Sequence, residues 1–269
     1  MKRRGHGDGG IDQRGENRWR LRWRVDGKRY AKSFEGTRKE AQAELRRLLK
    51  TADDGTHVAP DRQTVANYLR DWLSNDTGLS PKTLERYKQL AERQVVPHLG
   101  TVPLQKLKPA QIDTWHSTLL KSGLHPRTVG HAHRVLHRGL ERAVKLEIVS
   151  RNVAHAVTPP RVEYEEVEIL TSEQIGEVLK RLEDHPLRPI VVFALSSGCR
   201  RGEICALTWG GVDLDKGSVR IEQSLEETAA GLRVKPPKSK AGRRSLALPP
   251  HAVEMLRSCY RQQSSCGCG

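Results

Sequence analysis

The sequence has few aromatic residues and no long apolar run. Phe, Trp and Tyr make up 4% of its 269 residues, and the mean hydropathy is -0.64. Hydrophobic cores should therefore be small and separate, and the length suits about two domains. No apolar run is long enough for a membrane span, and no signal-peptide pattern follows Met1. We expect a cytoplasmic protein without a membrane partner.

The sequence also lacks cysteines at Cys-x-x-Cys spacing. Its five cysteines are Cys199, Cys205, Cys259, Cys266 and Cys268. A metal or redox site is one interpretation of these residues. Reduced thiols in a cytoplasmic protein are the simpler one. We therefore expect no metal site and no cofactor.

Acidic residues are too few to balance the basic ones. The formal net charge is +15 and the pI is about 9.9. The excess is uneven, because residues 1–60 carry +7, residues 61–160 carry +7 and residues 161–269 carry +1. A basic excess of this kind favours a nucleic acid or an anionic surface as the partner.

The clearest local pattern is a strict alternation in residues 18–25. Apolar side chains occupy one face of this predicted strand, and arginines occupy the other: Arg18, Arg20, Arg22 and Arg24. Asp26-Gly27 predicts a hairpin turn, and Lys28–Phe34 predicts the partner strand. No acid is interleaved within the arginine face, so contact with nucleic acid is favoured over a merely solvated face.

Helical patterns fill most of the chain before residue 160. A capping box at Thr37–Glu40 begins a helix that ends near Thr51. After a polar linker at residues 52–63, four further helices begin near Thr64, Ser80, Pro109 and Pro126. Residues 152–161, which include Pro159-Pro160, are typical of an interdomain linker.

The remaining residues change from helices to short strands. Helices are predicted from Thr171 and over Leu187–Ser197. Strands are predicted at residues 212–214, 218–222, 232–234 and 245–248, and a last helix begins at Pro250. Between these groups, Ser196–Trp209 reads SSGCRRGEICALTW. Arginine grips phosphate with a planar pair of N–H groups, and arginine between two core segments is costly unless an anion meets it.

This segment resembles the first arginine box of the tyrosine recombinase (phage integrase) family. Gly198, Arg200, Gly202 and Glu203 match its four fixed positions. The family breaks DNA through a phosphotyrosine intermediate without metal or nucleotide, so the resemblance implies that Arg200 holds the scissile phosphate. Glu203 lies three residues after Arg200 and could orient its guanidinium.

A second stretch, Pro237–Pro249, resembles the hairpin that carries the family's general-acid lysine. The resemblance implies this role for Lys238, with Lys240 as the second choice and Arg243 as a further DNA contact. Cationic neighbours such as Arg200, Arg243 and Arg244 could lower the pKa of such a lysine. A basic turn that grips phosphate without proton transfer is the alternative.

The resemblance also implies an α+β multidomain architecture. An arm-type DNA-binding domain of a three-stranded sheet and a helix would occupy residues 1–55, with its weak first strand near Ile11. A four-helix, SAM-like core-binding domain would occupy residues 64–158, and a partial catalytic domain of mixed α/β structure residues 165–269. The implied DNA contacts are Lys28 beside the arginine face, Lys82, Thr83 and Arg86 on one helix, and Arg127, Thr128, His131, Arg134 and Arg138 on another.

The family next requires a His-x-x-Arg segment and a nucleophilic tyrosine, and neither follows Pro249. Tyr260 lies in a helix that the family places before His-x-x-Arg. We therefore expect an integrase truncated within its catalytic domain, which binds double-stranded attachment-site DNA and, by resemblance, forms a tetramer on it. A non-catalytic DNA-binding protein, such as a competitor or a decayed relic, is the alternative. A covalent adduct on a nicked attachment site would separate the two, and we expect none from this chain alone.

Overall fold

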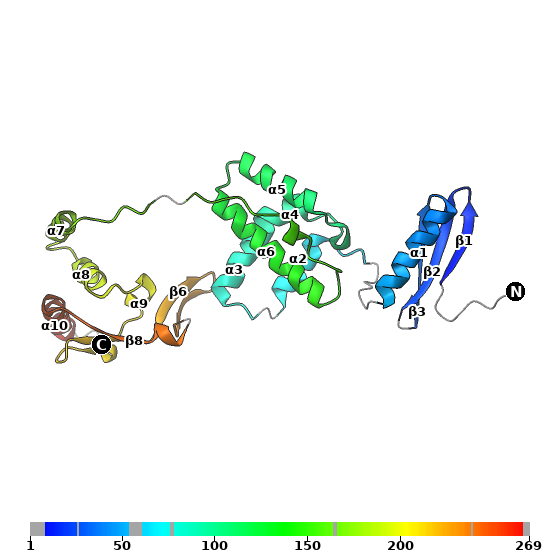
Figure 1. Cartoon of the computed structure of the whole chain (residues 1–269). Helices are drawn as coiled ribbons and strands as arrows, with labels where there is room; N and C mark the ends of the chain where they lie inside the picture. Colours follow the sequence, from blue (N-terminus) through cyan, green and yellow to red (C-terminus); the bar gives the residue numbers. More distant parts are fainter. Residues whose placement is uncertain are drawn as a thin grey trace. The chain divides into compact units, whose positions relative to one another are not determined.

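The structure, a computed structural model, describes residues 9–25, 27–53, 61–75, 78–163, 166–237 and 239–265. Its helices and short antiparallel strands confirm the expected α+β fold (Figure 1). The chain divides into two compact units: one ends at Val162, and the other runs from Glu163 onward and also takes in Ser80–Glu85. The finer division at residues 1–55, 64–158 and 165–269 stays a prediction. Within the described ranges no helix combines the length and the apolar character needed to cross a membrane.

The N-terminal part is a three-stranded antiparallel sheet covered by one helix. Its elements are β1 (Gly10–Gly15), β2 (Arg18–Val25), β3 (Lys28–Glu35) and α1 (Arg38–Asp53), with strand order β1-β2-β3. Burial alternates along β2 as the sequence predicts, so that Leu21 and Trp23 are buried against Ala41 and Leu45 of α1. Gly27 has φ +77°, the left-handed backbone that a tight turn here requires. Asp26 of the predicted turn lies outside the described residues.

The predicted capping box begins α1. The backbone N–H of Thr37 donates to the Glu40 carboxylate at 2.7 Å, and the Thr37 hydroxyl accepts from the backbone N–H of Glu40 at 3.4 Å. These bonds satisfy donors that a helix start otherwise leaves without a partner. The helix therefore starts where its apolar residues can meet the sheet.

Helices make up the middle of the chain. They are α2 (Val65–Ser74), α3 (Pro81–Leu90), α4 (Val96–Leu99), α5 (Pro109–Lys121) and α6 (Pro126–Lys145). A π-helical turn, Ala91–Val95, joins α3 to α4. Short 3-10 turns follow at Leu104–Lys106 (η2) and Val153–Ala156 (η3).

The core of this bundle is deeply buried. Ile112, Trp115 and Leu136 are each at most 2% exposed. Gly139 of α6 allows a close helix contact, because a Cβ there would lie 2.8 Å from Leu69 of α2. The buried Tyr68 hydroxyl donates to the Gly139 carbonyl at 2.8 Å, and burial raises the Tyr68 pKa to about 12.

The second unit combines short helices with short strands. Its helices are α7 (Ser172–Arg181), α8 (Arg188–Ser197), α9 (Arg201–Ile204) and α10 (Pro250–Ser265). One antiparallel sheet has the order β4-β5-β8: Val212–Asp213, Ser218–Ile221 and Arg244–Ala247. A separate hairpin pairs β6 (Ser224–Thr228) with β7 (Gly231–Lys235). Strand β6 was not expected from the sequence pattern. The remaining 3-10 turns are η4 (Trp209–Gly211) and η5 (Lys240–Gly242).

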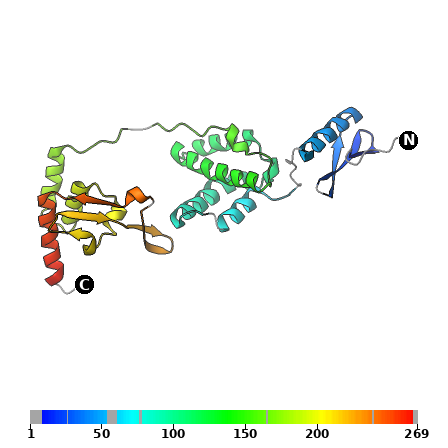
Figure 2. The same cartoon turned by 60° about the horizontal axis from the view of Figure 1, so that its bottom comes forward.

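The core of the second unit lies where α8 and α10 meet the sheet (Figure 2). Phe193, Val219, Ile221, Ala252 and Leu256 form it. Among the described residues of α7 none is fully buried, and Ile175 and Leu179 are half-buried. Tyr260 of α10 is 46% exposed and lies against Trp209, with ring centroids 5.1 Å apart.

Candidate functional site

The backbone around Gly198 places Arg200 at the start of α9. Gly198 ends α8 with φ +61°, a left-handed conformation that favours glycine. The chain then turns, and Arg200 is extended at φ -70° and ψ 149° immediately before α9. The three-residue spacing suggests that Arg200 shares a helical face with Glu203, but in the structure it does not. It is the residue that precedes the helix.

The carboxylate of Glu203 is the centre of the site. Glu203 is 4% exposed. It accepts a hydrogen bond from the backbone N–H of Arg200 at 3.0 Å and another from Arg200 Nη1 at 3.0 Å. Arg244 of β8 binds the same carboxylate through Nη2 at 2.8 Å and Nη1 at 3.2 Å. We call these three residues the Arg200–Glu203–Arg244 cluster.

Burial raises the pKa of Glu203 and pairing with the arginines lowers it, and the effect of pairing is the larger. Hydrogen bonding by Arg244 is the largest cause that lowers the Glu203 pKa, with the Arg200 backbone and side chain adding to it and burial opposing it; the pKa falls to about 2. Glu203 is therefore ionised at neutral pH and holds both guanidinium groups. The Arg200 side chain remains 78% exposed. Since a guanidinium has several N–H donors, Arg200 is oriented and still accessible to an anion.

This role of Arg244 is not apparent from the sequence pattern. The pattern predicts a strand from Ser245 and gives Arg244 only as a cationic neighbour that could lower a lysine pKa. In the structure β8 begins at Arg244, which is half-buried and faces Glu203, while Arg243 is exposed. Extending the period of two backward by one residue would have placed Arg244 on the inward face.

Two glycines allow neighbouring segments to approach closely beside the Arg200–Glu203–Arg244 cluster. A Cβ on Gly202 would lie 2.6 Å from the Leu225 carbonyl oxygen and from Ser224 Oγ, so glycine allows β6 to approach α9. A Cβ on Gly242 would lie 2.5 Å from Pro237. Lys238 falls between these last two residues but lies outside the described residues, so its role as general acid stays a prediction.

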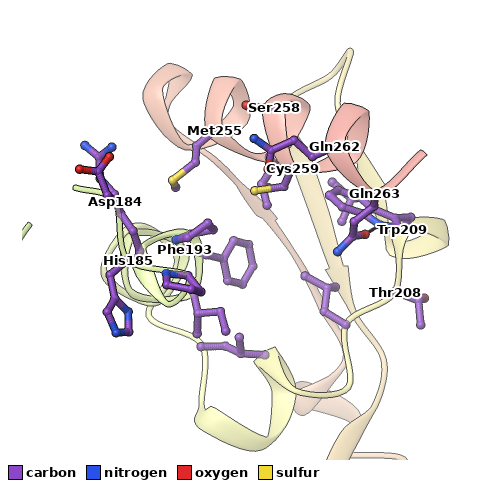
Figure 3. A pocket seen from close by; sticks show the side chains of 18 of the residues that line it. Asp184, His185, Phe193, Thr208, Trp209, Met255, Ser258, Cys259, Gln262 and Gln263 are labelled. Carbon is purple, nitrogen blue, oxygen red and sulfur yellow. Dashed lines mark hydrogen bonds between the residues drawn. The ribbon is translucent and has the colours of Figure 1, made fainter. Parts of the chain in front are cut away.

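A separate cleft opens between α8, α10 and the segment after α9 (Figure 3). It has a volume of 740 Å³ and an apolar wall that includes Phe193, Leu207 and Met255. Neither Arg200 nor Arg244 is among the described residues that line it. The cleft is therefore separate from the Arg200–Glu203–Arg244 cluster.

The arginine face of β2 is exposed, but it is not free of acids as the sequence suggested. Arg18 pairs with Glu35 of β3 at 3.0 Å, and Arg22 pairs with Asp12 of β1 at 2.9 Å. The acids come from neighbouring strands, which the alternation within one strand cannot reveal. Within the described parts of the chain, no ion pair involves Arg20 or Arg24.

The strand register moves Lys28 away from this face. Lys28 lies directly opposite Val25, on the side of the sheet that α1 covers. Arg29 lies opposite Arg24 instead and adds a cation that sequence reasoning missed. Counting outward from a two-residue turn at positions 26 and 27 would have found it.

Candidate contacts on two helices of the bundle come together around His131. Burial, followed by the positive charges of Arg134, Arg86 and Arg127, lowers the His131 pKa. Arg86 lies on α3 and the other two on α6, so one cationic surface draws on both helices. Arg138 stacks over the Tyr87 ring at 5.9 Å from its centroid.

Three further candidates are engaged locally. Lys82 pairs with Glu85 at 3.6 Å on α3. The Thr83 hydroxyl lies 2.8 Å from that of Ser80, where it takes part in starting α3. Thr128 is half-buried on α6. The role of all these residues in DNA contact stays a prediction.

Known proteins share both the helical domain and the wider fold. The model of the phage integrase N-terminal SAM-like domain matches residues 64–120. An integrase from Streptomyces ambofaciens is 33% identical over 275 residues, covering 97% of this chain and 70% of that protein. The Tn1549 transposon integrase, solved in complex with a circular intermediate DNA, is 18% identical with a TM-score of 0.65 and covers 74% of this chain and 65% of that one. A lambda integrase tetramer bound to a Holliday junction is 18% identical with a TM-score of 0.56 and covers 93% and 74%.

A SAM-like helical bundle followed by a mixed α/β unit with an arginine–glutamate box defines the integrase class of protein. The chain belongs to the tyrosine recombinase (phage integrase) family, as its similarity to the Streptomyces integrase shows. It spans 70% of that relative's length and 44% to 66% of the length of the next seven curated relatives.

Proposed function

We propose that this chain is a site-specific integrase that binds duplex attachment-site DNA and grips a backbone phosphate with Arg200. The observation that carries the proposal is the buried Glu203 carboxylate, which holds the exposed Arg200 guanidinium at 3.0 Å. An arginine positioned before the reaction can stabilise charge on phosphate without further reorganisation. Glu203 touches Arg200 rather than the phosphate, so it is a positioning residue.

Two cationic surfaces supply the attraction for DNA in this proposal. One is the arginine face of β2, and the other surrounds His131 on α3 and α6. Sequence-independent affinity for duplex comes mainly from cations that neutralise phosphates. The solved relatives bound to circular intermediate DNA and to a Holliday junction support the same partner.

Tetramer formation on DNA, a cytoplasmic location and a part in phosphotyrosine strand exchange complete the proposal, with the His-x-x-Arg segment and the nucleophilic tyrosine not supplied by these 269 residues. They rest on membership of the family and on the likeness to the lambda integrase tetramer bound to a Holliday junction. In this scheme Lys238 donates the proton to the leaving oxygen.

The phosphate grip is tested by Arg200→Ala beside Arg201→Ala, a matched control that removes the same charge from the next residue. Binding of each protein to a fluorescein-labelled duplex of mixed sequence is followed by anisotropy over a salt series. We expect Arg200→Ala to weaken binding more than Arg201→Ala, because only Arg200 is held by Glu203. Equal losses would show that Arg200 acts only as general surface charge.

The role of the arginine face needs its own variant. Replacing Arg18, Arg20, Arg22 and Arg24 together by Ala should weaken binding and flatten the salt slope by as much as about 0.9 for each phosphate that the variant no longer neutralises. The control replaces Arg38, Lys39, Arg46 and Lys50, four exposed cations of α1. Unchanged binding in the first variant would remove the sheet from the proposed DNA surface.

A further inference from the structure

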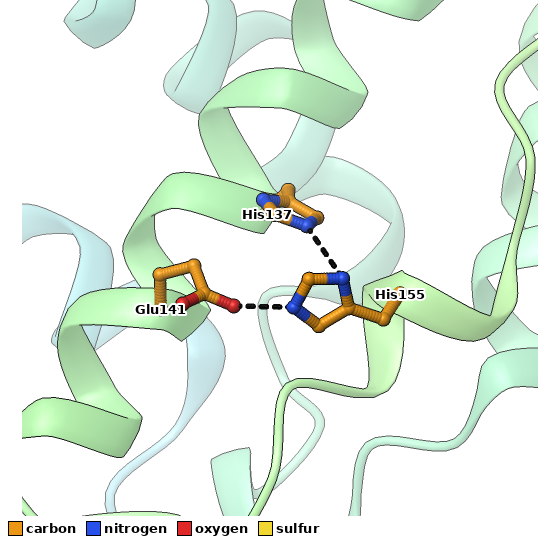
Figure 4. Close-up of side chains that lie close together, drawn as sticks. All are labelled: His137, Glu141 and His155. Carbon is orange, nitrogen blue, oxygen red and sulfur yellow. Dashed lines mark hydrogen bonds and ion pairs between the residues drawn. The ribbon is translucent and has the colours of Figure 1, made fainter.

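Three side chains of the types that bind metal ions meet where the η3 turn lies against α6 (Figure 4). His137 and Glu141 lie one helical turn apart on α6, and His155 comes from η3. His155 Nδ1 lies 3.2 Å from His137 Nε2, and His155 Nε2 lies 2.6 Å from Glu141 Oε1. One potential ligand atom from each residue lies within 4.8 Å of the others. The three ligands therefore form one cluster from two elements.

A buried amide fixes the cluster from behind. Asn152 is 7% exposed, and its Nδ2 donates to Glu141 Oε1 at 2.7 Å and to the His137 carbonyl at 3.1 Å. Its Oδ1 accepts from the backbone N–H of Ala154 at 3.0 Å, which starts η3. Asn152 thus holds a carboxylate of α6 against the turn that carries His155. Hydrogen-bonded partners of this kind orient the ligands of metal sites.

The chemistry of the three donors selects a class of ion. Two imidazole nitrogens and one carboxylate oxygen are a ligand set that Zn²⁺ uses when a fourth position stays open. Imidazole ligands suit zinc, copper and nickel, whereas calcium and magnesium prefer oxygen. We propose that His137, Glu141 and His155 form a binding site for a divalent transition-metal ion, with Zn²⁺ as the ion that fits best.

Binding an ion requires the His155 ring to move, because its two nitrogens face different partners. Metal–ligand bonds of about 2.1 Å place neighbouring tetrahedral ligands about 3.4 Å apart. The α6 backbone and Asn152 position His137 and Glu141. The His155 side chain is 63% exposed, so its ring can turn one nitrogen toward the ion. A bound ion would join η3 to α6.

A metal-free hydrogen-bonded trio is the competing explanation. An ionised carboxylate only accepts, so the His155 nitrogen facing Glu141 carries a proton in that case. The other His155 nitrogen then accepts from His137 if the His155 ring is neutral. An ion would displace the proton from any nitrogen that it binds. The two explanations therefore differ in whether an ion binds and in which side chains it needs.

Cobalt(II) titration of the whole chain, stripped with chelator and kept reduced, tests the site. We expect visible absorption bands of a tetrahedral cobalt site with nitrogen and oxygen ligands, reversed by added Zn²⁺. The variants His155→Ala and Glu141→Gln should each weaken cobalt binding at least tenfold. The matched control is His98→Ala, which removes an exposed histidine of α4 in the same bundle. Thermal unfolding without metal checks that each variant is folded.

The outcomes are separable from those of the DNA-binding experiments, because no DNA is present. Bands of thiolate-to-cobalt charge transfer alone would assign the ion to cysteines and overturn the proposal. Equal cobalt affinity in His155→Ala and the wild-type chain would also overturn it. A rise in unfolding temperature with Zn²⁺ in the wild-type chain, absent from His155→Ala, would support it, because an ion that binds the folded state stabilises it.

Discussion

Two arginine–carboxylate pairs of this chain have nearly the same geometry and very different surroundings. Arg18 and Glu35 on the N-terminal sheet lie 3.0 Å apart with side chains 71% and 74% exposed. Arg244 and Glu203 in the second unit lie 2.8 Å apart with side chains 27% and 4% exposed. Water screens the attraction within the first pair, so that each partner can leave the other and pair with another ion. The second pair is held in place because neither water nor a salt ion can easily take the place of either partner in a buried site.

In the proposed function, one residue type serves two tasks. Exposed arginines on β2 can leave their acids and follow a phosphate backbone, which suits binding without a fixed geometry. Arg200 has one N–H group tied to a buried carboxylate and the rest of its side chain in solvent. This arrangement suits a fixed grip on a single phosphate.

The largest effect is expected from removing the buried charge. Glu203→Gln leaves Arg244 without an ionised partner, and the cost should be about 3 kcal/mol of folding free energy. Hydrogen exchange at β5 and α8 measures the stability of the second unit directly. The control is Glu222→Gln, the same change at an exposed residue near the end of β5. Equal protection in the two variants would mean that losing the buried carboxylate costs no more stability than losing an exposed one.

Acid should weaken the same contact in the wild-type chain. The folded pKa of Glu203 is about 2, below its usual 4.5. A depressed carboxyl pKa stabilises the folded state above pH 4.5, and this stability is lost as the pH falls toward 2. The loss should reach about 3 kcal/mol over that window. Exchange protection measured from about pH 5 downward should therefore fall more steeply in the wild type than in Glu203→Gln, and parallel curves would contradict the assignment.

The buried pair also shows where sequence reasoning stopped. Arg200 and Glu203 were found because they are three residues apart and match a motif. Arg244 lies 41 residues beyond Glu203, and only the packing of β8 brings it to the carboxylate. Likewise β6 was missed because Ser224–Thr228 is stabilised by pairing with β7 rather than by its own pattern. Long-range contacts of this kind leave no local signal.

The next effect separates the paired from the unpaired arginines of β2. Arg20→Ala with Arg24→Ala should flatten the salt slope of duplex binding by about 1.8, because each arginine is taken to neutralise one phosphate. Arg18→Ala with Arg22→Ala should flatten it less, since Glu35 and Asp12 already balance these charges. Anisotropy over a salt series compares the two proteins at the same net charge. An equal change in the two variants would contradict this and would mean that DNA displaces the acids completely.

Local patterns predicted the elements better than they predicted the faces. Helix starts at Thr37 and Thr171, and the alternation along β2, depend on neighbours in sequence, and all three were confirmed. The side of the sheet taken by Lys28 depends on strand register. The meeting of His137 with His155 depends on how η3 packs on α6. Both require tertiary structure, because residues distant in sequence decide them.

The smallest effect is expected from breaking the exposed pair. Glu35→Gln removes the partner of Arg18. The free energy of unfolding, measured by thermal unfolding, should change by less than about 0.5 kcal/mol, since exposed ion pairs contribute little. Duplex binding should strengthen slightly, because one negative charge leaves the arginine face and Arg18 becomes available to phosphate. Asp12→Asn makes the equivalent change beside Arg22 and should behave in the same way. If Glu35→Gln cost as much stability as Glu203→Gln, burial would not be what distinguishes the two pairs, and the fixed grip assigned to Arg200 would lose its physical basis.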